Sequence, residues 1–546
     1  MSVGVLNDLV WSTPIQIDTK LGKRWMRSWA IPQHFQTGFF MFWNKNKDAL
    51  RKKGYSIGTG ASGEWRLFEW QVGVKNFRNI FGKNNVKEIK IVTESTLPKY
   101  EVKKTSGLRP WQVPSVARLC AALERHGAAI DGSCTGVGKS YIAVGVAREL
   151  GLKIAVVCPK AVITPWNKII TKHFGMAPVF VMNYESVKTG KYKSIGTWKP
   201  VSPNSVKEKF KWNIPNDTLI IFDESHKLKG LNTQNSEIGI AAKDQGFPIL
   251  CCSATPAISP LEMKALGYIL GMYKAGKWSA YLRDHGCGKG RFGWEFSGDK
   301  RILSKLHGDI FLERGVRLNI SDIPNFPESE IIADAYDMDE KSKKELNALY
   351  DEMDAELAVL NRKDKSTPEW KRNVLTVQMR ALQQAEILKV PLFMETIEDA
   401  IENGMSVAVF CNFTDTIKAL SERLKTKCIV WGKNKRQGER DKCIEDFQSD
   451  RSRLILLNSA AGGAGVSLHD LNGKYPRMAI ISPSYSVVTF KQCLGRVWRD
   501  GALSKSIQKI VFVAGTSEEA VCNKLQAKLN NLDAINDNDL SPTPIF

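Results

Sequence analysis

Three segments of the sequence carry residue types and spacings suited to phosphate chemistry. The first, Asp131-Gly-Ser-Cys-Thr-Gly-Val-Gly-Lys-Ser140, lies between a short apolar run and a stretch with a helical pattern. Glycines let the backbone curl so that successive N–H groups point at phosphate oxygens, and the dipole of the following helix adds to the attraction. In such a loop, Lys139 would neutralise the outer phosphates of a nucleotide and Ser140 would hold Mg²⁺.

The second segment ends the apolar run Leu219–Phe222 with Asp223-Glu-Ser-His226. A buried strand that delivers two carboxylates at its carboxyl end is the acidic partner of a phosphate loop. Asp223 would reach Mg²⁺, and Glu224 would polarise the water that attacks the γ-phosphate. An Asp-Glu pair alone also fits a solvated turn.

The first segment also has an alternative explanation when it is taken alone. It has Ser133 where the motif usually has its first glycine, so it also fits a Gly-rich turn that opens a helix. The two segments follow one another in the expected order, with Asp223 lying 84 positions after Lys139. Together they predict ATP hydrolysis.

The third segment, Gln492-Cys-Leu-Gly-Arg-Val-Trp-Arg499, places Gln492, Arg496 and Arg499 at positions i, i+4 and i+7. On a helix these residues share one face, so both guanidinium groups can enter a single cleft. Arginines that reach a phosphate from another lobe stabilise transition-state charge, which makes hydrolysis depend on closure of the lobes. A solvated basic face is the alternative for this segment alone.

Two weaker signals lie near the acidic pair. Ser253-Ala-Thr-Pro256 follows the next apolar run, where the hydroxyls of Ser253 and Thr255 can hydrogen-bond the acidic motif and relay the nucleotide state. His226, taken alone, is better explained as an ordinary capping or core histidine.

Composition limits the class of protein. The chain has 546 residues, of which 43% are hydrophobic and 25% charged, so it is an ordinary globular chain of three or four domains rather than a small binding module. Its net charge of +21 favours a polyanionic partner, with nucleic acid first and an anionic membrane surface second. Eleven scattered cysteines without a C-x-x-C support neither a disulfide framework nor a zinc site. We expect a soluble intracellular protein, cytoplasmic or associated with a nucleoid or nucleus and not secreted, because no signal peptide or 18-residue apolar run is present.

Short apolar runs alternate with helical stretches from about residue 108, which is typical of buried parallel strands with crossover helices. The pattern predicts an α/β protein with two doubly wound parallel-sheet lobes joined by a helical connection. The expected helices of the connection are Met338–Leu360 and Trp370–Glu402, and the polar tail from Asn531 is expected to be loosely ordered. The expected strands are Ala128–Ile130, Ile154–Cys158, Val179–Met182, Leu219–Phe222, Ile249–Cys252, Val407–Phe410, Cys428–Val430, Leu454–Leu457, Met478–Ile481 and Ile510–Val513.

The first 100 residues are set apart by six tryptophans and by 16 Lys and Arg against 7 Asp and Glu. Strands at Phe39–Trp43 and Glu64–Trp70, with a short helix at Asp48–Gly54 between them, indicate a small α+β module. This module either grips DNA or uses its tryptophans only to build a core, and its charge favours DNA slightly. The stretch Tyr273–Lys305 also interleaves basic and aromatic residues, and fits a nucleic-acid contact or a solvated insertion equally well.

The ordered motifs resemble those of the superfamily 2 helicases and translocases over residues 108–530. Within that superfamily, the sequence is similar to the Swi/Snf-like branch, a relative of the DEAD/DEAH-box enzymes. A compact motor of this kind suits a virus, a phage or a bacterium. The motifs are Arg109-Pro-Trp-Gln112, Thr135–Ser140, Asp223–His226, Ser253–Pro256, Phe311-Leu-Glu-Arg314 with Arg317 and Asp322-Ile-Pro324, Asn458–Leu468, Gln492–Arg499 and Thr516-Ser-Glu-Glu519.

The resemblance implies two RecA-like lobes with ATP between them and nucleic acid running across both. By position, Gln112 would read adenine with Trp111 as a stacking partner, Gly465 would lie near the nucleotide, and Thr255, with His226, Ser253 and Gln492, would couple ATP to DNA. Arg496 and Arg499 would be arginine fingers. The implied nucleotide contacts are Trp111, Gln112, Thr135, Gly136, Val137, Gly138, Lys139, Ser140 and Gly465, with Lys160, Lys277 and Arg291 on nucleic acid.

Two departures from the family pattern matter. Ser225 stands where this branch usually has alanine, and the helical insertions are short, which argues against nucleosome remodelling. The expected domains are an accessory module at 1–100, the first lobe at 101–325, the helical connection at 326–402, the second lobe at 403–530 and a tail at 531–546.

The sequence therefore predicts an ATP- and Mg²⁺-dependent DNA helicase or translocase that moves along duplex or branched DNA, for which a monomer suffices. An RNA helicase remains the nearest alternative. A motor subunit, or a non-catalytic assembly factor that acts with a partner protein, is the further one.

Overall fold

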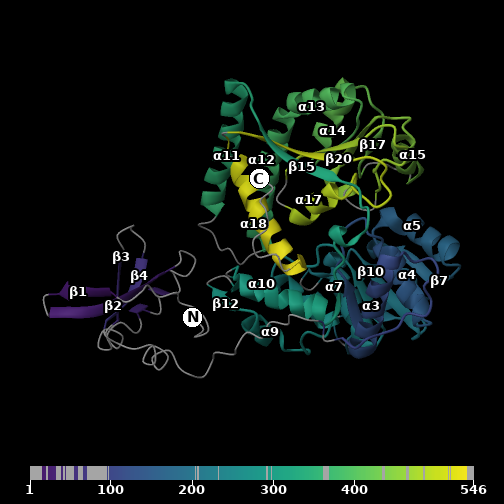
Figure 1. Ribbon diagram of the computed structural model, residues 1–546, viewed down its shortest axis with the longest axis horizontal. Helices are drawn as coiled ribbons and strands as arrows, with labels where there is room; N and C mark the ends of the chain where they lie inside the picture. Colours follow the sequence, from purple (N-terminus) through teal and green to yellow (C-terminus); the bar gives the residue numbers. More distant parts are fainter. Residues whose placement is uncertain are drawn as a thin grey trace. The chain divides into compact units, whose positions relative to one another are not determined.

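The computed structural model describes residues 15–19, 22–31, 39–40, 43–44, 55–59, 65–70, 95, 97–202, 205, 208–230, 233–290, 293–296, 298–360, 368–432, 437–462, 466–483, 486–514, 516 and 518–537. The chain divides into two compact units (Figure 1). One unit holds Met1–Lys90 and Leu282–Asp299, and the other holds Ile91–Tyr281 and Lys300–Phe546. Both large sheets lie in the second unit.

The first large sheet has six parallel strands in the order β14-β5-β11-β10-β6-β7. Side chains of its flanking helices, such as Leu119 of α3 and Ile142 of α4, are fully buried against it. The strands are β5 (Ala128–Asp131), β6 (Lys153–Cys158), β7 (Pro178–Asn183), β10 (Thr218–Asp223), β11 (Ile249–Cys252) and β14 (Gly315–Val316). The helices from Val113 to His307 are α3 (Val113–His126), α4 (Lys139–Glu149), α5 (Ile163–Lys168), α6 (Tyr184–Lys188), α7 (Gln234–Asp244), α8 (Lys264–Ile269), α9 (Trp278–Asp284) and α10 (Lys300–His307). Short helical turns are η4 (Pro110–Gln112), η5 (Lys160–Val162), η6 (Ile169–His173), η7 (Ser225–Leu228), η8 (Pro260–Met263), η9 (Gly308–Leu312) and η10 (Ile320–Asp322).

The second large sheet also has six parallel strands, in the order β15-β20-β19-β16-β18-β17. Its two faces carry separate buried clusters, one around Phe410 and Phe490 and the other around Phe393 and Val409. The strands are β15 (Ser329–Tyr336), β16 (Ser406–Cys411), β17 (Ile429–Val430), β18 (Leu454–Asn458), β19 (Arg477–Ile481) and β20 (Ser506–Val513). The helices are α14 (Thr414–Arg423), α15 (Gln437–Gln448), α16 (Ser459–Gly462), α17 (Val487–Leu494) and α18 (Glu518–Asp537).

This topology confirms the predicted α/β class with two doubly wound parallel sheets, and every expected apolar run coincides with a strand. Three features of the two lobes were not predicted. The first sheet has an additional short edge strand, β14, which pairs with β5. The strand β15 pairs with β20 from Ser329 to Tyr336, although its mixture of polar and apolar residues lacks the apolar run of a central strand. An antiparallel ribbon of β8 (Gly196–Pro200) and β9 (Glu208–Trp212) is inserted before β10.

Three helices lie between β15 and β16, which are both strands of the second sheet, so the helical connection expected between the lobes lies within the second lobe. They are α11 (Glu340–Leu360), α12 (Pro368–Leu388) and α13 (Val390–Glu402). The single helix expected at Trp370–Glu402 is divided at Lys389, because Pro391 has no N–H to continue α12 and suits the first turn of a new helix. The expected connection also begins differently, since β15 occupies its first residues. No helix in the part of the chain that the structure describes is both long and apolar enough to cross a membrane.

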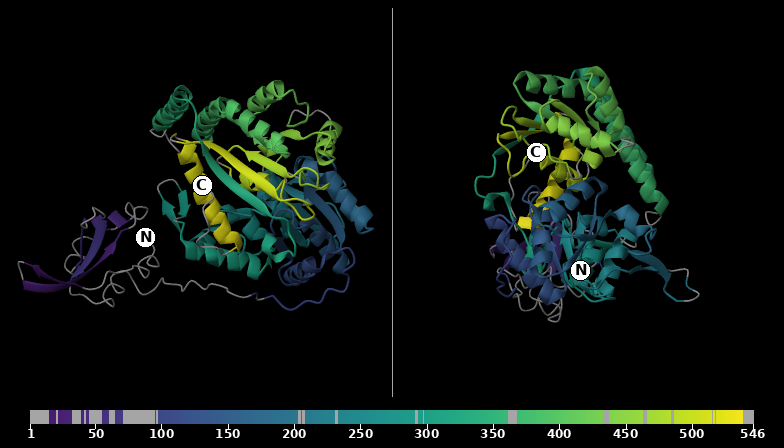
Figure 2. Two further views of the ribbon diagram at one scale, coloured as in Figure 1. Left: turned by 45° about the horizontal axis from the view of Figure 1, so that its top comes forward. Right: turned by 90° about the vertical axis from the view of Figure 1, so that its right-hand side faces the viewer.

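The last described helix, α18, overturns the expected loose tail as far as Asp537. Leu525, Leu529, Leu532 and Ile535 are fully buried along its length, so the helical apolar spacing continues past Asn531. Leu525, Leu529 and Leu532 pack in the core of the second sheet, and the end of the helix lies beside α10 of the first lobe (Figure 2). The C-terminal helix thus belongs to one lobe and reaches the other.

The N-terminal unit contains an antiparallel sheet in the order β1-β2-β4-β3. The strand expected at Phe39–Trp43 is wrong, because the described residues there are helical and place the Phe39 and Trp43 rings in a stack, with Phe39 also against buried Trp29. The strand expected at Glu64–Trp70 forms β4, whereas the helix expected at Asp48–Gly54 lies outside the described residues. The strands of this unit are β1 (Ile15–Thr19), β2 (Gly22–Ala30), β3 (Tyr55–Thr59) and β4 (Trp65–Trp70), with a separate hairpin of β12 (Cys287–Gly290) and β13 (Gly293–Phe296).

A buried ion pair fixes the start of α18 to the helical connection. The ammonium of Lys389 donates to Glu518 Oε1 at 2.6 Å and to the carbonyl oxygen of Val511 at 3.3 Å. The other oxygen of Glu518 accepts the backbone N–H of Val513 at 2.9 Å. Since both charged side chains are almost fully buried, neither can be removed without leaving the other uncompensated.

Replacing Glu518 with alanine should therefore lower the free energy of unfolding by about 3 kcal/mol or more, because an unpaired ammonium stays in the core. Chemical denaturation of the purified protein measures this. The matched control is Lys418→Ala, which removes an exposed pair with Asp415 and should change the same quantity by less than about 1 kcal/mol. Equal effects of the two substitutions would contradict the structural role of the buried pair.

Candidate active site

The phosphate loop runs from the end of β5 to the start of α4. Gly136 and Gly138 have φ values of +88° and +90°, which L side chains rarely adopt. A Cβ atom on Gly138 would also lie 2.4 Å from Nε2 of Gln112. The ammonium of Lys139 donates to the carbonyl oxygens of Ser133 and Cys134, both at 2.8 Å, so it lies across the inside of the loop.

Gln112 holds this loop from the side of η4. Its Oε1 accepts the N–H of Arg109 at 3.0 Å, and its Nε2 donates to the carbonyl oxygen of Val137 at 3.3 Å. Trp111 packs beside the loop against a small apolar cluster that contains Val137. The structure thus brings Gln112 and Trp111 to the phosphate loop, and the recognition of adenine by Gln112 stays a prediction.

The acidic pair follows β10, which is central in the first sheet. The pKa of Asp223 is raised to about 6 by burial and by the neighbouring carboxylate of Glu224. For Glu224, burial is outweighed by the hydrogen bond and charge of His226, which together with Lys139 and Arg496 lower the pKa to about 2. Glu224 itself has a left-handed backbone, with φ of 52°, which turns the chain sharply after the strand. The two carboxylates thus sit at the strand end where the phosphate loop also lies.

Trp166 of α5 is a site residue that was not predicted. Its indole Nε1 donates to Asp223 Oδ2 at 2.9 Å, while Asp223 Oδ1 accepts the N–H of Glu224 at 3.0 Å. The Trp166 side chain is almost fully buried, so the hydrogen bond is shielded from water. The sequence gives no signal for this contact, because a tryptophan within a helical stretch is usually a core residue.

The structure joins the coupling residues predicted around the acidic motif. His226 Nδ1 lies 3.2 Å from Glu224 Oε2 and 3.2 Å from Ser253 Oγ, so it bridges the acidic motif and the end of β11. Ser253 Oγ also accepts the N–H of Thr255 at 3.2 Å. His226 thus contacts both the acidic motif and the end of β11, and its role in coupling stays a prediction.

The two predicted arginines follow α17, which ends at Leu494, so the helical face expected for Gln492, Arg496 and Arg499 is wrong. Arg496 is buried and Arg499 is partly buried in the segment after the helix. Arg496 Nε donates to the carbonyl oxygen of Gln492 at 2.7 Å, and Arg499 Nη1 donates to Ser467 Oγ at 2.8 Å. Burial and the charge of Arg496 lower the pKa of Arg499 to about 9, an effect that Glu224 opposes. The solvated basic face considered for this segment is therefore excluded.

Gly495 and Arg499 of the second lobe lie against the phosphate loop of the first. A Cβ atom on Gly136 would lie 3.1 Å from Cγ of Arg499, and one on Gly495 would touch the hydroxyl of Thr135. Burial lowers the pKa of Arg496, whereas the carboxylates of Glu224 and Asp223 act against that shift. The arginines of one lobe and the carboxylates of the other are thus close enough for their charges to attract one another across the two lobes.

The structure says less about the other predicted residues, which are the Mg²⁺ ligand Ser140, Gly465 and the nucleic-acid contacts. Ser140 lies in the first turn of α4, next to Lys139, as a Mg²⁺ ligand would. Lys160 and Lys277 are exposed, and Gly465 and Arg291 lie outside the described residues. In the insertion, the rings of Tyr273, Trp278 and Tyr281 pack on one another 5.2–5.4 Å apart, which favours a small core of its own there.

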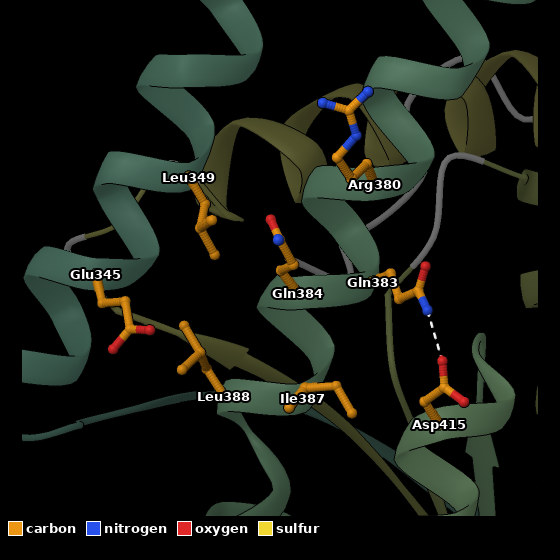
Figure 3. A pocket seen from close by; sticks show the side chains of 8 residues that line it. All are labelled: Glu345, Leu349, Arg380, Gln383, Gln384, Ile387, Leu388 and Asp415. Carbon is orange, nitrogen blue, oxygen red and sulfur yellow. Dashed lines mark hydrogen bonds between the residues drawn. The ribbon is translucent and has the colours of Figure 1, made fainter.

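A separate pocket of about 410 Å³ lies between α11, α12 and α14, and it involves none of the predicted site residues (Figure 3). Leu349, Ile387 and Leu388 give it an apolar floor, and Gln383 donates to Asp415 at 2.7 Å across its edge. The lining residues are Glu345, Leu349, Arg380, Gln383, Gln384, Ile387, Leu388 and Asp415.

A phosphate loop and an acidic pair in one parallel sheet, with arginines supplied by a second, define a two-lobed ATP-hydrolysing motor. The comparisons with known proteins agree. Residues 389–501 match the model of the helicase conserved C-terminal domain. A protein of Acanthamoeba polyphaga mimivirus, which carries the provisional name of an ATP-dependent RNA helicase, is 31% identical over 481 residues, or 83% of this chain and 87% of its own length.

Two further relatives are named for work on DNA. The human DNA annealing helicase and endonuclease ZRANB3 is 23% identical over 368 residues, which are 63% of this chain and 33% of that protein. A Caenorhabditis elegans homologue of the SWI/SNF-related matrix-associated actin-dependent regulator of chromatin subfamily A-like protein 1 is 22% identical over 434 residues, or 76% of this chain and 60% of that protein. The chain belongs to the superfamily 2 helicases, with relatives of the Swi/Snf-like branch, and is an ATP hydrolase.

Replacing Trp166 with phenylalanine should lower the kcat of ATP hydrolysis about tenfold or more, because a hydrogen bond to a charged group contributes about 1.5–3 kcal/mol. Steady-state hydrolysis at varied Mg²⁺ measures this, and the variant should also need more Mg²⁺ for half-maximal activity. The control is Trp212→Phe, since the equally buried Trp212 indole donates only to the carbonyl oxygen of Ile238 at 3.0 Å. Unchanged kcat and Mg²⁺ dependence in Trp166→Phe would show that Asp223 needs no such support.

Proposed function

We propose that this helicase is a DNA translocase or helicase that couples ATP hydrolysis to movement along duplex or branched DNA. The main support for a two-lobed ATP-driven motor is the contact between Arg499 of the second lobe and the phosphate loop of the first. Two observations favour DNA as the substrate. Relatives named as DNA annealing helicases match over 63% of this chain, and the chain has a net charge of +21.

We propose that ATP is bound with Mg²⁺, and the residues present fit both. The backbone at positions 136 and 138 has positive φ values that favour glycine, as a cradle for phosphate requires, and Lys139 already lies across the loop. Ser140 and Asp223 offer the hydroxyl and carboxylate oxygens that Mg²⁺ prefers. When bound, the metal would neutralise charge on the phosphates, and Glu224, with its lowered pKa, would stay ionised to orient water.

The proposed cycle follows from the placement of the arginines. ATP would hold the lobes closed, since Arg496 and Arg499 of the second lobe would contact phosphates bound in the first. Hydrolysis would weaken that attraction and let the lobes separate. The His226–Ser253 hydrogen bond would carry the change from Glu224 towards the nucleic acid. One lobe would shift along the phosphate backbone during each cycle.

Proposed nucleic-acid contacts lie in both units. Lys160 follows β6 as an exposed residue of η5 and would face the phosphates, with Lys277 and Arg291 contributing from the insertion. The N-terminal module, residues 1–100, would add a second grip through its excess of basic residues. A single chain supplies all the residues that we propose for the ATP site, so a monomer would suffice, and the proposal leaves room for a partner protein.

RNA is the alternative substrate, because the mimivirus relative carries the name of an RNA helicase. We predict that duplex or forked DNA stimulates ATP hydrolysis more than single-stranded DNA or RNA does, and that moderate salt suppresses the stimulation. Steady-state ATPase rates with each nucleic acid at low and moderate salt measure this. Stimulation by RNA alone would assign the protein to the RNA helicases, and no stimulation at all would point to a partner-dependent motor.

Lys139→Ala should abolish ATP hydrolysis and leave DNA affinity nearly unchanged, because the ammonium acts on phosphate inside the loop. ATPase assays and fluorescence anisotropy with labelled DNA measure the two properties. Lys153→Ala is a suitable control, since that exposed lysine pairs only with Asp217 at the start of β6. Hydrolysis at the wild-type rate in Lys139→Ala would overturn the assignment of the site.

A further inference from the structure

The segment after η9 runs along the phosphate loop as a brace. Gly315 and Val316 of β14 pair with Ile130 and Asp131, and the backbone contacts continue past the strand. The N–H of Gly132 donates to the carbonyl oxygen of Val316 and the N–H of Cys134 to that of Leu318, both at 3.0 Å. The loop is thus held on this side by the chain from 315 to 318.

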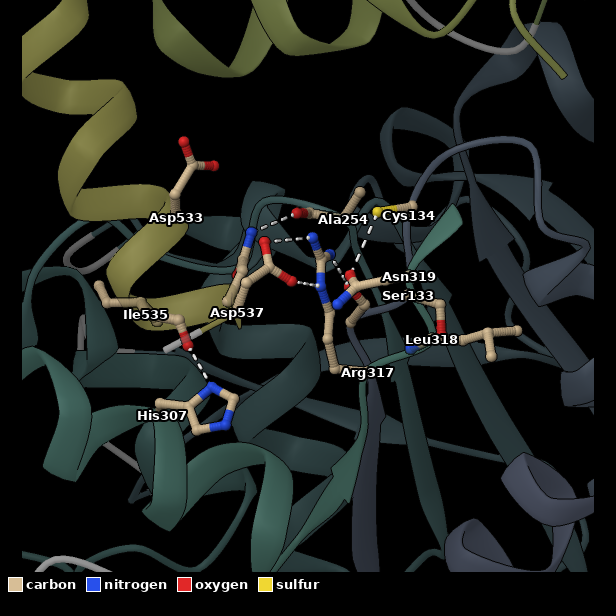
Figure 4. Close-up of polar contacts among 12 residues, drawn as sticks. Ser133, Cys134, Ala254, His307, Arg317, Leu318, Asn319, Asp533, Ile535 and Asp537 are labelled. Atoms are coloured by element: carbon tan, nitrogen blue, oxygen red, sulfur yellow. Dashed lines mark hydrogen bonds and ion pairs between the residues drawn. The ribbon is translucent and has the colours of Figure 1, made fainter. Parts of the chain in front are cut away.

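Arg317 projects from this brace and contacts both lobes (Figure 4). Its Nη1 donates to the carbonyl oxygen of Gly132 in the phosphate loop. Its Nε and Nη2 donate to the two carboxylate oxygens of Asp537 at 2.7 Å and 3.0 Å, which is a bidentate ion pair. Asp537 is the last residue of α18, whose earlier turns lie in the core of the second lobe.

Two neighbours of Asp537 make further contacts with the first lobe. Asn536 Nδ2 donates to the carbonyl oxygen of Ala254 at 2.9 Å, within the Ser253–Thr255 motif. His307 of α10 lies with Nδ1 2.9 Å from the carbonyl oxygen of Ile535, and the ring nitrogen must be the donor there (Figure 4). The end of α18 therefore touches two segments that surround the nucleotide, the phosphate loop and the motif after β11.

We propose that Arg317 and Asp537 are positioning residues that tie the second lobe to the phosphate loop, and so keep Arg499 in place for hydrolysis. The Arg317 side chain is 9% exposed and that of Asp537 is 24% exposed, so loss of the Asp537 carboxylate leaves a largely buried guanidinium without its ion pair and releases the end of α18. ATP itself is bound mainly by the first lobe, whereas the arginines act on charge that develops in the transition state. Loss of the tie should therefore lower kcat and leave KM for ATP nearly unchanged.

The test is a comparison of Asp537→Asn with Asp533→Asn in the full chain. Asp533 lies one turn earlier on α18 and pairs at 3.0 Å with Lys491, which belongs to the same lobe. We expect kcat to fall about fivefold or more in Asp537→Asn, with KM for ATP within about twofold, and little change in Asp533→Asn. Asp537→Glu, which retains the carboxylate, should recover part of the loss.

A double-mutant cycle with Arg499→Ala separates positioning from general destabilisation. If Asp537 acts through Arg499, Asp537→Asn should cost little further activity once Arg499 is absent. Equal losses in both backgrounds, or a rise in KM with kcat unchanged, would overturn the proposal. If Asp537→Asn fails to fold, Asn536→Ala is the second variant, because it removes the uncharged hydrogen bond to Ala254. We expect it to lower kcat in the wild-type background and to have little further effect when Arg499 is absent. A wild-type kcat in Asn536→Ala would contradict the proposal that the end of α18 positions Arg499. The readout is ATP hydrolysis itself, so it does not depend on which nucleic acid is the track.

Discussion

Charge can be buried in a protein only when opposite charge is buried with it, and this constraint organises the whole molecule. Asp223 and Glu224 end a central strand of one sheet, while Arg496 and Arg499 come from the helix end of another. The arginine pKa values are lowered by burial and supported by the carboxylates of the opposite lobe. Lys139 and His226 act on the carboxylates within their own lobe, and the arginines add positive charge from the other lobe, so the two lobes interact electrostatically.

A parallel sheet solves the problem of bringing these groups together. The carboxyl ends of its strands meet at one edge, which places the phosphate loop after β5, the acidic pair after β10 and Ser253 after β11 side by side. Hydrogen bonds then link neighbouring strand ends, as His226 does between Glu224 and Ser253. The local sequence determines which functional side chain follows each strand, and the register of the sheet determines the distances between these side chains.

Much of the fold and site could be predicted because strand and motif signals are local. The apolar runs identify the strands, and the loop around Lys139 requires only a few neighbouring residues. The helical spacing expected for Arg496 and Arg499 was wrong, because α17 ends at Leu494. Contacts between distant segments could not be predicted. Trp166 and Asp223 are 57 positions apart, and Arg317 and Asp537 are 220 apart, so no spacing rule connects them. The helix at Phe39 was missed because aromatic residues favour strands in general, whereas these rings pack on Trp29.

The path of the chain also limits how the molecule can be divided. The second sheet takes its edge strand β15 from residues that precede the helical connection, and β20 would be left with a bare edge if the chain were cut after Tyr336. An uncovered strand edge is a template for pairing with other chains, so a second lobe expressed from residue 403 would tend to self-associate. The second sheet includes β15, which precedes residue 403, and the end of α18 contacts the first lobe. Recombination that separated the two lobes would break both connections, so the lobes could be exchanged only as a pair.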